Sequence, residues 1–131
     1  MRKFIRVGRD KRKAREKITA EIFTPDKLVN EMLDAIPQEG WEEGKSYLDD
    51  CCGNGQFLVW VLLRKISKGH KPTEALKTIF GVELMEDNTE ECRQRLLAVV
   101  NLWEDITPEH EAIVNKNIVC ADGLTYDYEF D

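Results

Sequence analysis

The segment Tyr47–Phe57, with the sequence YLDDCCGNGQF, constrains the fold of this chain more than any other part of it. A short apolar run, which we expect to be a buried strand, leads through Asp49 and Asp50 into a turn with Gly53 and Gly55. Glycine has no Cβ, so the backbone can turn sharply and a ligand can approach the start of the following helix closely. Two carboxylates argue against a phosphate and favour a ligand that carries a cation or hydroxyl groups. The segment therefore predicts a site for a nucleotide-like ligand.

Two further segments have the pattern of strands that end beside an acid. Thr78–Leu84 is apolar up to Glu83, and a doubly wound sheet places a ribose-binding carboxylate at this position. The third strand is expected at 117–121, and Asp122-Gly123-Leu124 follows it. Crossover connections between parallel strands are right-handed. The sequence thus predicts an α/β fold with a mostly parallel three-stranded sheet and flanking helices, in which the first and third strands form opposite edges.

Apolar residues at helical spacing predict the helices that connect these strands. They are expected at 28–36, 57–68, 72–76 and 87–103, while 101–117 is polar and is interpreted as a connection. The helix at 57–68 is apolar almost all round, so we expect it to be buried. His70 and His110 each stand in polar surroundings and are expected to be exposed.

The three strand ends, in this order, resemble the S-adenosylmethionine-binding half of a class I methyltransferase, and more narrowly the N6-adenine DNA methyltransferases. Phe23-Thr24-Pro25, just before the first helix, matches the F-T-P segment of that family. The resemblance covers roughly Glu21 to Phe130. It implies a Rossmann-like class I methyltransferase half-fold that binds S-adenosylmethionine or S-adenosylhomocysteine.

The resemblance also implies roles for individual residues. Asp49 to Phe57 corresponds to the loop around the methionine moiety, Glu83 to the acid on the ribose hydroxyls, and Asp122 to the acid on the adenine amino group. An ordinary tight turn, a surface acid and an Asp-Gly turn remain the alternative explanations for these features. The candidate cofactor-binding residues are Phe23, Thr24, Asp49, Cys51, Gly53, Gly55, Phe57, Glu83, Leu84, Asp122, Gly123 and Leu124.

One motif of that family is missing from the sequence. Its enzymes carry an Asn/Asp-Pro-Pro-aromatic tetrapeptide after a fourth strand, and this sequence contains no Pro-Pro pair. The resemblance implies that the tetrapeptide binds the target amino group and stacks on the flipped base. We therefore identify no catalytic residue and expect methyl transfer to need a partner or second subunit. Alternatives are a non-catalytic regulator or decoy of methylation and restriction systems, and an enzyme that degrades S-adenosylmethionine.

The first strand is predicted to leave an open edge. In a whole class I methyltransferase this strand is central and pairs with the fourth strand. Here it can pair only with residues 123–131 or with another chain, and unpaired strand edges favour association. We expect a homo-oligomer or a catalytic partner that supplies the fourth strand, unless the chain is a fragment.

The charge of the chain is unevenly distributed. The net charge is −6, yet residues 1–20 carry nine Lys and Arg against Asp10 and Glu16. We interpret 1–20 as a basic arm and 21–131 as the cofactor-binding domain. The arm is a candidate for contacts with DNA phosphates; the alternatives are a solvated segment, or packing on an acidic surface of its own domain or of a partner. The candidate nucleic-acid contacts are Arg9, Lys11, Arg12, Lys13 and Arg15.

Cysteine usage and hydropathy indicate the compartment. The four cysteines form no C-x-x-C pair, which favours reduced thiols, and no spacing of Cys, His and Asp predicts a metal site. No signal-peptide core and no apolar run long enough for a membrane helix occurs. We therefore expect a cytoplasmic protein without a membrane partner.

Overall fold

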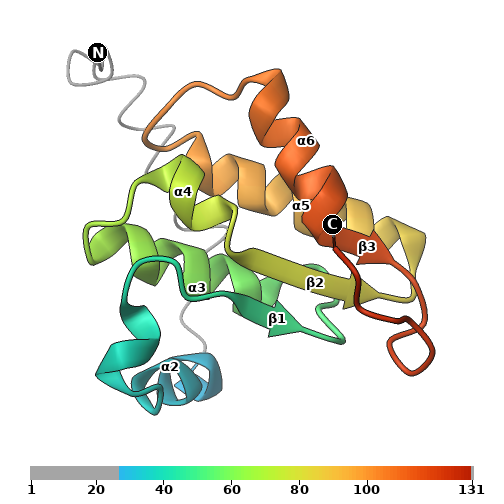
Figure 1. The fold of residues 1–131 in the computed structure, drawn as a ribbon, viewed down its shortest axis with the longest axis horizontal. Coiled ribbons are helices and arrows are strands. Elements are labelled where there is room, and N and C mark those ends of the chain that lie inside the picture. Colours follow the sequence, from blue (N-terminus) through green and yellow to red (C-terminus); the bar gives the residue numbers. More distant parts are fainter. Residues whose placement is uncertain (1–26, 131) are drawn as a thin grey trace.

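A computed structural model describes residues 27–130 and contains a parallel three-stranded sheet (Figure 1). The strands are β1 (Tyr47–Asp49), β2 (Ile79–Glu83) and β3 (Ile118–Cys120), in the order β1-β2-β3. Leu48 lies opposite Phe80, and Gly81 opposite Ile118. The predicted α/β half-fold and its strand order are confirmed. The predictions for Phe23, Thr24 and the arm residues Arg9, Lys11, Arg12, Lys13 and Arg15 lie outside the described residues.

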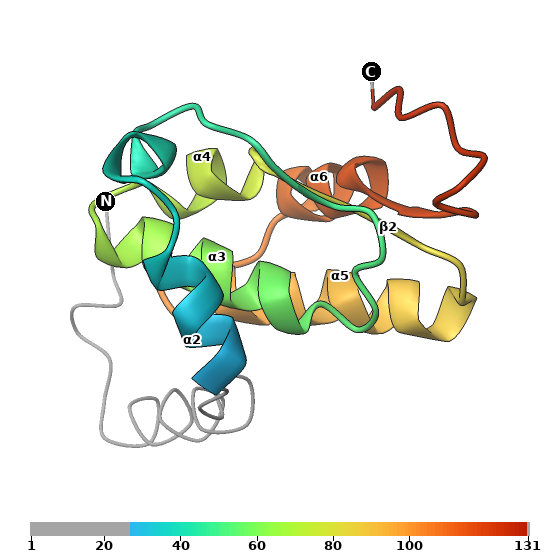
Figure 2. The same ribbon diagram turned by 90° about the horizontal axis from the view of Figure 1, so that it is seen from below.

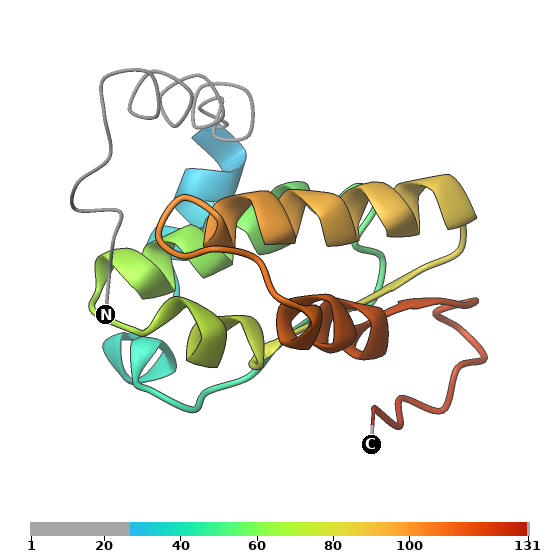
Figure 3. The ribbon, with the colours of Figure 1, turned by 90° about the horizontal axis from the view of Figure 1, so that it is seen from above.

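Helices precede and connect the strands, and two of them cover one face of the sheet. They are α2 (Lys27–Asp34), the 3-10 helix η2 (Gln38–Trp41), α3 (Gln56–Ser67), α4 (Pro72–Leu76), α5 (Glu86–Val100) and α6 (Pro108–Asn117). Figure 2 shows α3 and α5 together on one side of the sheet, with the C-terminal segment on the other side. Figure 3 shows the same arrangement from above, with α5 alongside α3.

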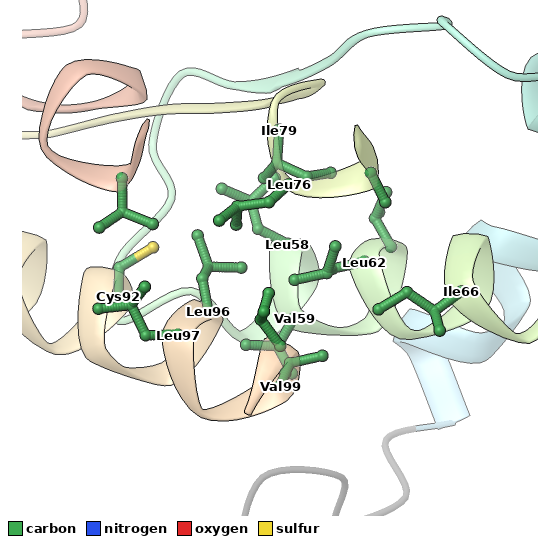
Figure 4. Close-up of a cluster of buried hydrophobic side chains, with 14 of the residues drawn as sticks. Leu58, Val59, Leu62, Ile66, Leu76, Ile79, Cys92, Leu96, Leu97 and Val99 are labelled. Carbon is green, nitrogen blue, oxygen red and sulfur yellow. The ribbon is translucent and has the colours of Figure 1, made fainter. Parts of the chain in front are cut away.

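The hydrophobic core lies between the sheet and the helices α3 and α5 (Figure 4). Leu58 and Leu62 of α3 meet Leu96 and Val99 of α5, and all four are fully buried. The predicted burial of the apolar helix after the glycine turn is confirmed. Gly81 of β2 permits this close packing, because a Cβ there would lie 2.9 Å from the Leu58 side chain.

The first strand is less buried than its sequence suggested. Among the described residues β1 pairs only with β2, and the Leu48 side chain is 49% exposed. Leu48 alternates with Tyr47 and Asp49, so it points away from the face that α3 covers. The expectation of a buried strand was wrong, because burial of an edge strand depends on what covers its second face.

The polar stretch 101–117 was interpreted as a connection, but it contains the helix α6. Pro108 starts α6, and the backbone N–H of Thr107 donates to His110 Nδ1 at 2.9 Å. His110 Nε2 lies 2.9 Å from Glu104 Oε1, and His70 Nε2 lies 2.8 Å from the carbonyl oxygen of Trp41. Both histidines are buried, so the expectation of exposure was wrong. His70 and Trp41 are 29 residues apart, and His110 Nε2 also lies 2.9 Å from Thr73 Oγ1, 37 residues away, so no local pattern reveals these contacts.

Lys65 on α3 is a fully buried lysine. Its Nζ donates to the Lys45 carbonyl oxygen at 2.5 Å and to Thr78 Oγ1 at 2.6 Å, and it lies 4.7 Å from the centre of the Tyr47 ring. These groups are neutral, so they do not replace the solvation that a charged amine loses on burial. Burial therefore lowers the pKa of Lys65 to about 8.

This lowered pKa predicts that Lys65 stabilises the domain more in mildly alkaline solution. The unfolded chain keeps the proton on Lys65 up to about pH 10.5, whereas the folded chain releases it near pH 8. At Lys65 the unfolded state thus binds more protons in this window, so this residue should raise the free energy of unfolding between about pH 8 and 10, by at most about 1.4 kcal/mol per pH unit. A hydrogen bond with Cys52 and burial raise the pKa of Cys92, which opposes this rise above about pH 9, so the comparison with Lys65→Met isolates the lysine. Urea unfolding at several pH values measures this. Lys65→Met should flatten the rise, and an equal rise in the variant would contradict the assignment.

Candidate functional site

The glycine loop connects β1 to α3 at the carboxyl end of the sheet. Gly53 and Gly55 have φ values of 55° and 90°, in the left-handed region that side chains disfavour. The backbone N–H of Cys52 donates to the Val82 carbonyl oxygen at 3.0 Å, which joins the loop to β2. A Cβ on Gly55 would lie 2.8 Å from Cys92 Sγ on α5. The loop therefore needs glycine at this position both for its backbone conformation and for its packing.

Glu83, at the end of β2, holds the glycine loop and the start of α5. Its Oε1 accepts a hydrogen bond from the Gly53 backbone N–H at 3.0 Å, and its Oε2 accepts one from the Met85 backbone N–H at 3.1 Å. The Asn88 amide Nδ2 lies 3.4 Å from Oε2. Glu83 is only 7% exposed. Each carboxylate oxygen has two lone pairs, so Oε1, which accepts from Gly53 alone, can still accept a hydrogen bond from a ligand hydroxyl, and Oε2 can do so in place of the long contact with Asn88.

Asp49, at the end of β1, borders a cavity of about 440 Å³. Its Oδ1 accepts a hydrogen bond from the Cys51 backbone N–H at 3.1 Å. Burial raises the pKa of Asp49, this hydrogen bond opposes the rise, and the carboxylates of Asp50 and Glu83 add to it. Negative charge is thus concentrated beside a half-enclosed space, which favours a cationic ligand group. The cavity is lined by Val29, Met32, Leu48, Asp49, Asp50, Cys51, Cys52, Gln56 and Phe57.

Asp122, Gly123 and Leu124 form a turn at the end of β3. Asp122 Oδ1 accepts a hydrogen bond from the Leu124 backbone N–H at 2.9 Å, as in an Asp-Gly turn. A Cβ on Gly123 would lie 2.6 Å from the Asp50 carbonyl oxygen, so the turn meets the loop after β1. Leu124 is 95% exposed and Leu84, after β2, is 64% exposed. Both apolar side chains are exposed to solvent at the same end of the sheet.

The structure thus brings most of the predicted residues to one end of the sheet. Asp49, Cys51 and Phe57 line the same cavity, and the backbone N–H of Gly53 donates a hydrogen bond to Glu83. Six lining residues are not among the candidate cofactor-binding residues: Val29, Met32, Leu48, Asp50, Cys52 and Gln56. Asn88, beside Glu83, is also absent from the candidate residues. Nothing local distinguishes these residues from ordinary core or helix positions, because their role depends on how α2 and α5 pack.

A glycine loop and carboxylates at the ends of parallel strands form the arrangement in which doubly wound α/β folds typically bind nucleotide-like cofactors. Within this class, the family model described as N-6 DNA methylase matches residues 10–131. The chain therefore belongs to the N-6 DNA methylase family, as the ordered motifs predicted. No curated protein and no solved structure matches the chain.

Two further features are absent from the described part of the chain. No helix between residues 27 and 130 is long and apolar enough to cross a membrane. No group of three or more His, Cys, Asp or Glu in the same range could hold a metal ion.

Proposed function

We propose that this chain is the S-adenosylmethionine-binding part of a DNA adenine-N6 methyltransferase that acts together with a partner or second subunit. Membership of the N-6 DNA methylase family supports the reaction class, since that family generally uses this cofactor. The observation that carries the proposal is the pair of hydrogen bonds that Glu83 accepts from Gly53 and Met85. They hold a buried carboxylate at the end of the middle strand, directly beside the glycine loop.

The residues present fit the three parts of this cofactor. The cavity beside Asp49 offers carboxylates to a sulfonium and an ammonium group. Glu83 can accept hydrogen bonds from ribose hydroxyls, as in other doubly wound folds. The exposed side chains of Leu84 and Leu124 can pack on the faces of an adenine ring. The Asp122 carboxylate can accept a hydrogen bond from the amino group of the adenine.

In the proposed reaction the bound cofactor supplies an electrophilic methyl group for direct transfer to the N6 atom of an extruded adenine. The chain's own residues would hold the cofactor and exclude water from its methionine end, which lowers the barrier through positioning and desolvation. The tetrapeptide that receives the base in this family is not among these 131 residues. We propose that the partner subunit supplies it.

Isothermal titration calorimetry with S-adenosylmethionine and S-adenosylhomocysteine tests the proposed site. We expect micromolar binding, and Asp49→Ala should weaken the binding of S-adenosylmethionine about tenfold or more, since charge-assisted contacts typically contribute 1.5–3 kcal/mol. Glu111→Ala, which removes an exposed acid from α6, serves as the matched control and should bind normally. Absence of binding by a folded wild-type protein would contradict the cofactor assignment.

Product analysis separates the proposal from its alternatives. With labelled S-adenosylmethionine and adenine-containing duplex DNA, the isolated chain should bind cofactor without forming N6-methyladenine, and methylation should require the partner. Breakdown of the cofactor in the absence of DNA would instead support a degrading enzyme. Binding that never leads to methylation with any candidate partner would support a regulator or decoy.

A further inference from the structure

The Asn88 side chain lies beside the carboxylate of Glu83. Its amide Nδ2 is 3.4 Å from Glu83 Oε2, which is longer than the range of about 2.7–3.2 Å for a good N–H···O hydrogen bond. Elsewhere in the described part of the chain the Asn88 amide has no hydrogen-bond partner. The side chain is half-buried. Asn88 thus carries an amide donor beside Glu83 that is only weakly satisfied.

The Asn88 side chain is not needed to cap the helix on which it lies. Asn88 is the third residue of α5, from which a side chain commonly reaches back to the N-cap backbone N–H. Here the N-cap residue is Met85, and its N–H already donates to Glu83 Oε2 at 3.1 Å. The buried hydroxyl of Thr89 donates to the Met85 carbonyl oxygen at 2.8 Å and fixes the first turn. The Asn88 amide is therefore held on an ordered turn and is available to a ligand.

Glu83 and Asn88 together match the hydrogen-bonding groups of a hydroxyl. A hydroxyl both donates and accepts, whereas a carboxylate only accepts, so Glu83 alone leaves the hydroxyl oxygen without a donor. A hydroxyl between the two side chains would donate to Glu83 Oε2 and accept from Asn88 Nδ2, in place of the long contact between these atoms. Glu83 Oε1 accepts from the Gly53 backbone N–H, and no side-chain amide accompanies it within residues 27–130. The two carboxylate oxygens are thus not equivalent toward a ribose.

Other ligand groups match this pair of side chains less well. A phosphate would be repelled by the buried carboxylate of Glu83. An ammonium group could donate to Glu83 but has no lone pair to accept from the Asn88 amide. The pair therefore favours a neutral hydroxyl.

We propose that Asn88 is a specificity-determining residue that selects ribose over deoxyribose in the bound cofactor. The inference rests on the proposed function, because it assigns a second side chain to the ribose that Glu83 is proposed to bind. A deoxyribose without the bridging hydroxyl would leave the Asn88 amide without this partner. Sites that hydrogen-bond a substrate hydroxyl discriminate strongly against analogues that lack it.

Calorimetric titration with S-adenosylhomocysteine and with its 2′-deoxy and 3′-deoxy analogues tests this inference. Asn88→Ala should weaken the binding of S-adenosylhomocysteine roughly three- to tenfold, as expected for one hydrogen bond. The affinity for one deoxy analogue should not change, because that analogue never makes the contact with Asn88. The affinity for the other analogue should fall by the same factor as that for S-adenosylhomocysteine. A merely structural role would weaken the binding of all three ligands equally.

The stability of the variant and a matched control complete the experiment. Asn88→Ala should unfold at no lower urea concentration than the wild type, because alanine has a higher helix propensity than asparagine. Gln94→Ala is the matched control, since Gln94 is an exposed amide on the same helix whose Nε2 donates to Glu90 Oε2 at 2.9 Å. It should bind all three ligands normally.

The possible outcomes separate this inference from the proposed function. Equal weakening of all three ligands by Asn88→Ala, or unchanged binding of all three, would overturn the role of Asn88 while the cofactor site stands. Absence of binding of S-adenosylhomocysteine by the folded wild-type protein would overturn the proposed function and this inference with it.

Discussion

Replacing Gly55 with alanine is expected to destabilise the domain by about 2–4 kcal/mol, since left-handed backbone and overpacking each cost 1–3 kcal/mol. Gly55 has a φ of 90°, and a Cβ would lie 2.8 Å from Cys92 Sγ and 3.3 Å from Cys92 Cα. Cys92 is fully buried on α5, and rotation of its thiol would leave its Cα 3.3 Å from the new Cβ. The midpoint and slope of urea unfolding measure the loss.

Two variants separate the backbone effect from the clash. Gly69→Ala is the matched control, because Gly69 has a φ of 103° but no atom within 4 Å of the new Cβ, so it should lose only about 1 kcal/mol. Gly55→Ala/Cys92→Ala should lose less stability than Gly55→Ala and Cys92→Ala lose together. Such non-additivity is expected for residues in contact. Equal losses for Gly55→Ala and Gly69→Ala would mean that packing against Cys92 is unimportant.

Glu83→Ala should have the largest effect on cofactor binding. The variant loses the carboxylate that is proposed to accept hydrogen bonds from the ribose hydroxyls. It also leaves the backbone N–H groups of Gly53 and Met85 without their hydrogen-bond acceptor. Hydrogen bonds to charged groups contribute 1.5–3 kcal/mol each, so the affinity for S-adenosylmethionine should fall about 100-fold or more. Calorimetric titration of the folded variant measures this change.

A nearby acid serves as the control for this prediction. Glu86 is an exposed acid in the first turn of α5, three residues after Glu83, and Glu86→Ala should bind the cofactor normally. Adenosine should compete for the wild-type site and lose affinity in Glu83→Ala by a similar factor, because the contact belongs to the ribose. If Glu83→Ala unfolds more easily but binds with unchanged affinity, Glu83 only holds the glycine loop.

The order of the functional segments could be predicted from the sequence. The glycine turn, the apolar runs and the acids that follow them are local patterns, and right-handed crossovers leave few ways to arrange three parallel strands. The positions of β1, β2 and β3, the buried helix α3 and the placement of Glu83 at a strand end follow from these patterns. The same motifs predicted the family that residues 10–131 match.

The tertiary structure decided which groups meet. Glu83 and Gly53 are thirty residues apart in sequence, and their hydrogen bond exists only because β2 lies next to β1. The burial of His110 and Lys65 depends on partners from other segments, so polar surroundings in the sequence did not predict it. The exposure of Leu48 likewise depends on whether another segment covers the second face of the sheet. Local patterns specify the elements of this protein, whereas contacts between distant segments determine burial, pKa values and the shape of the site.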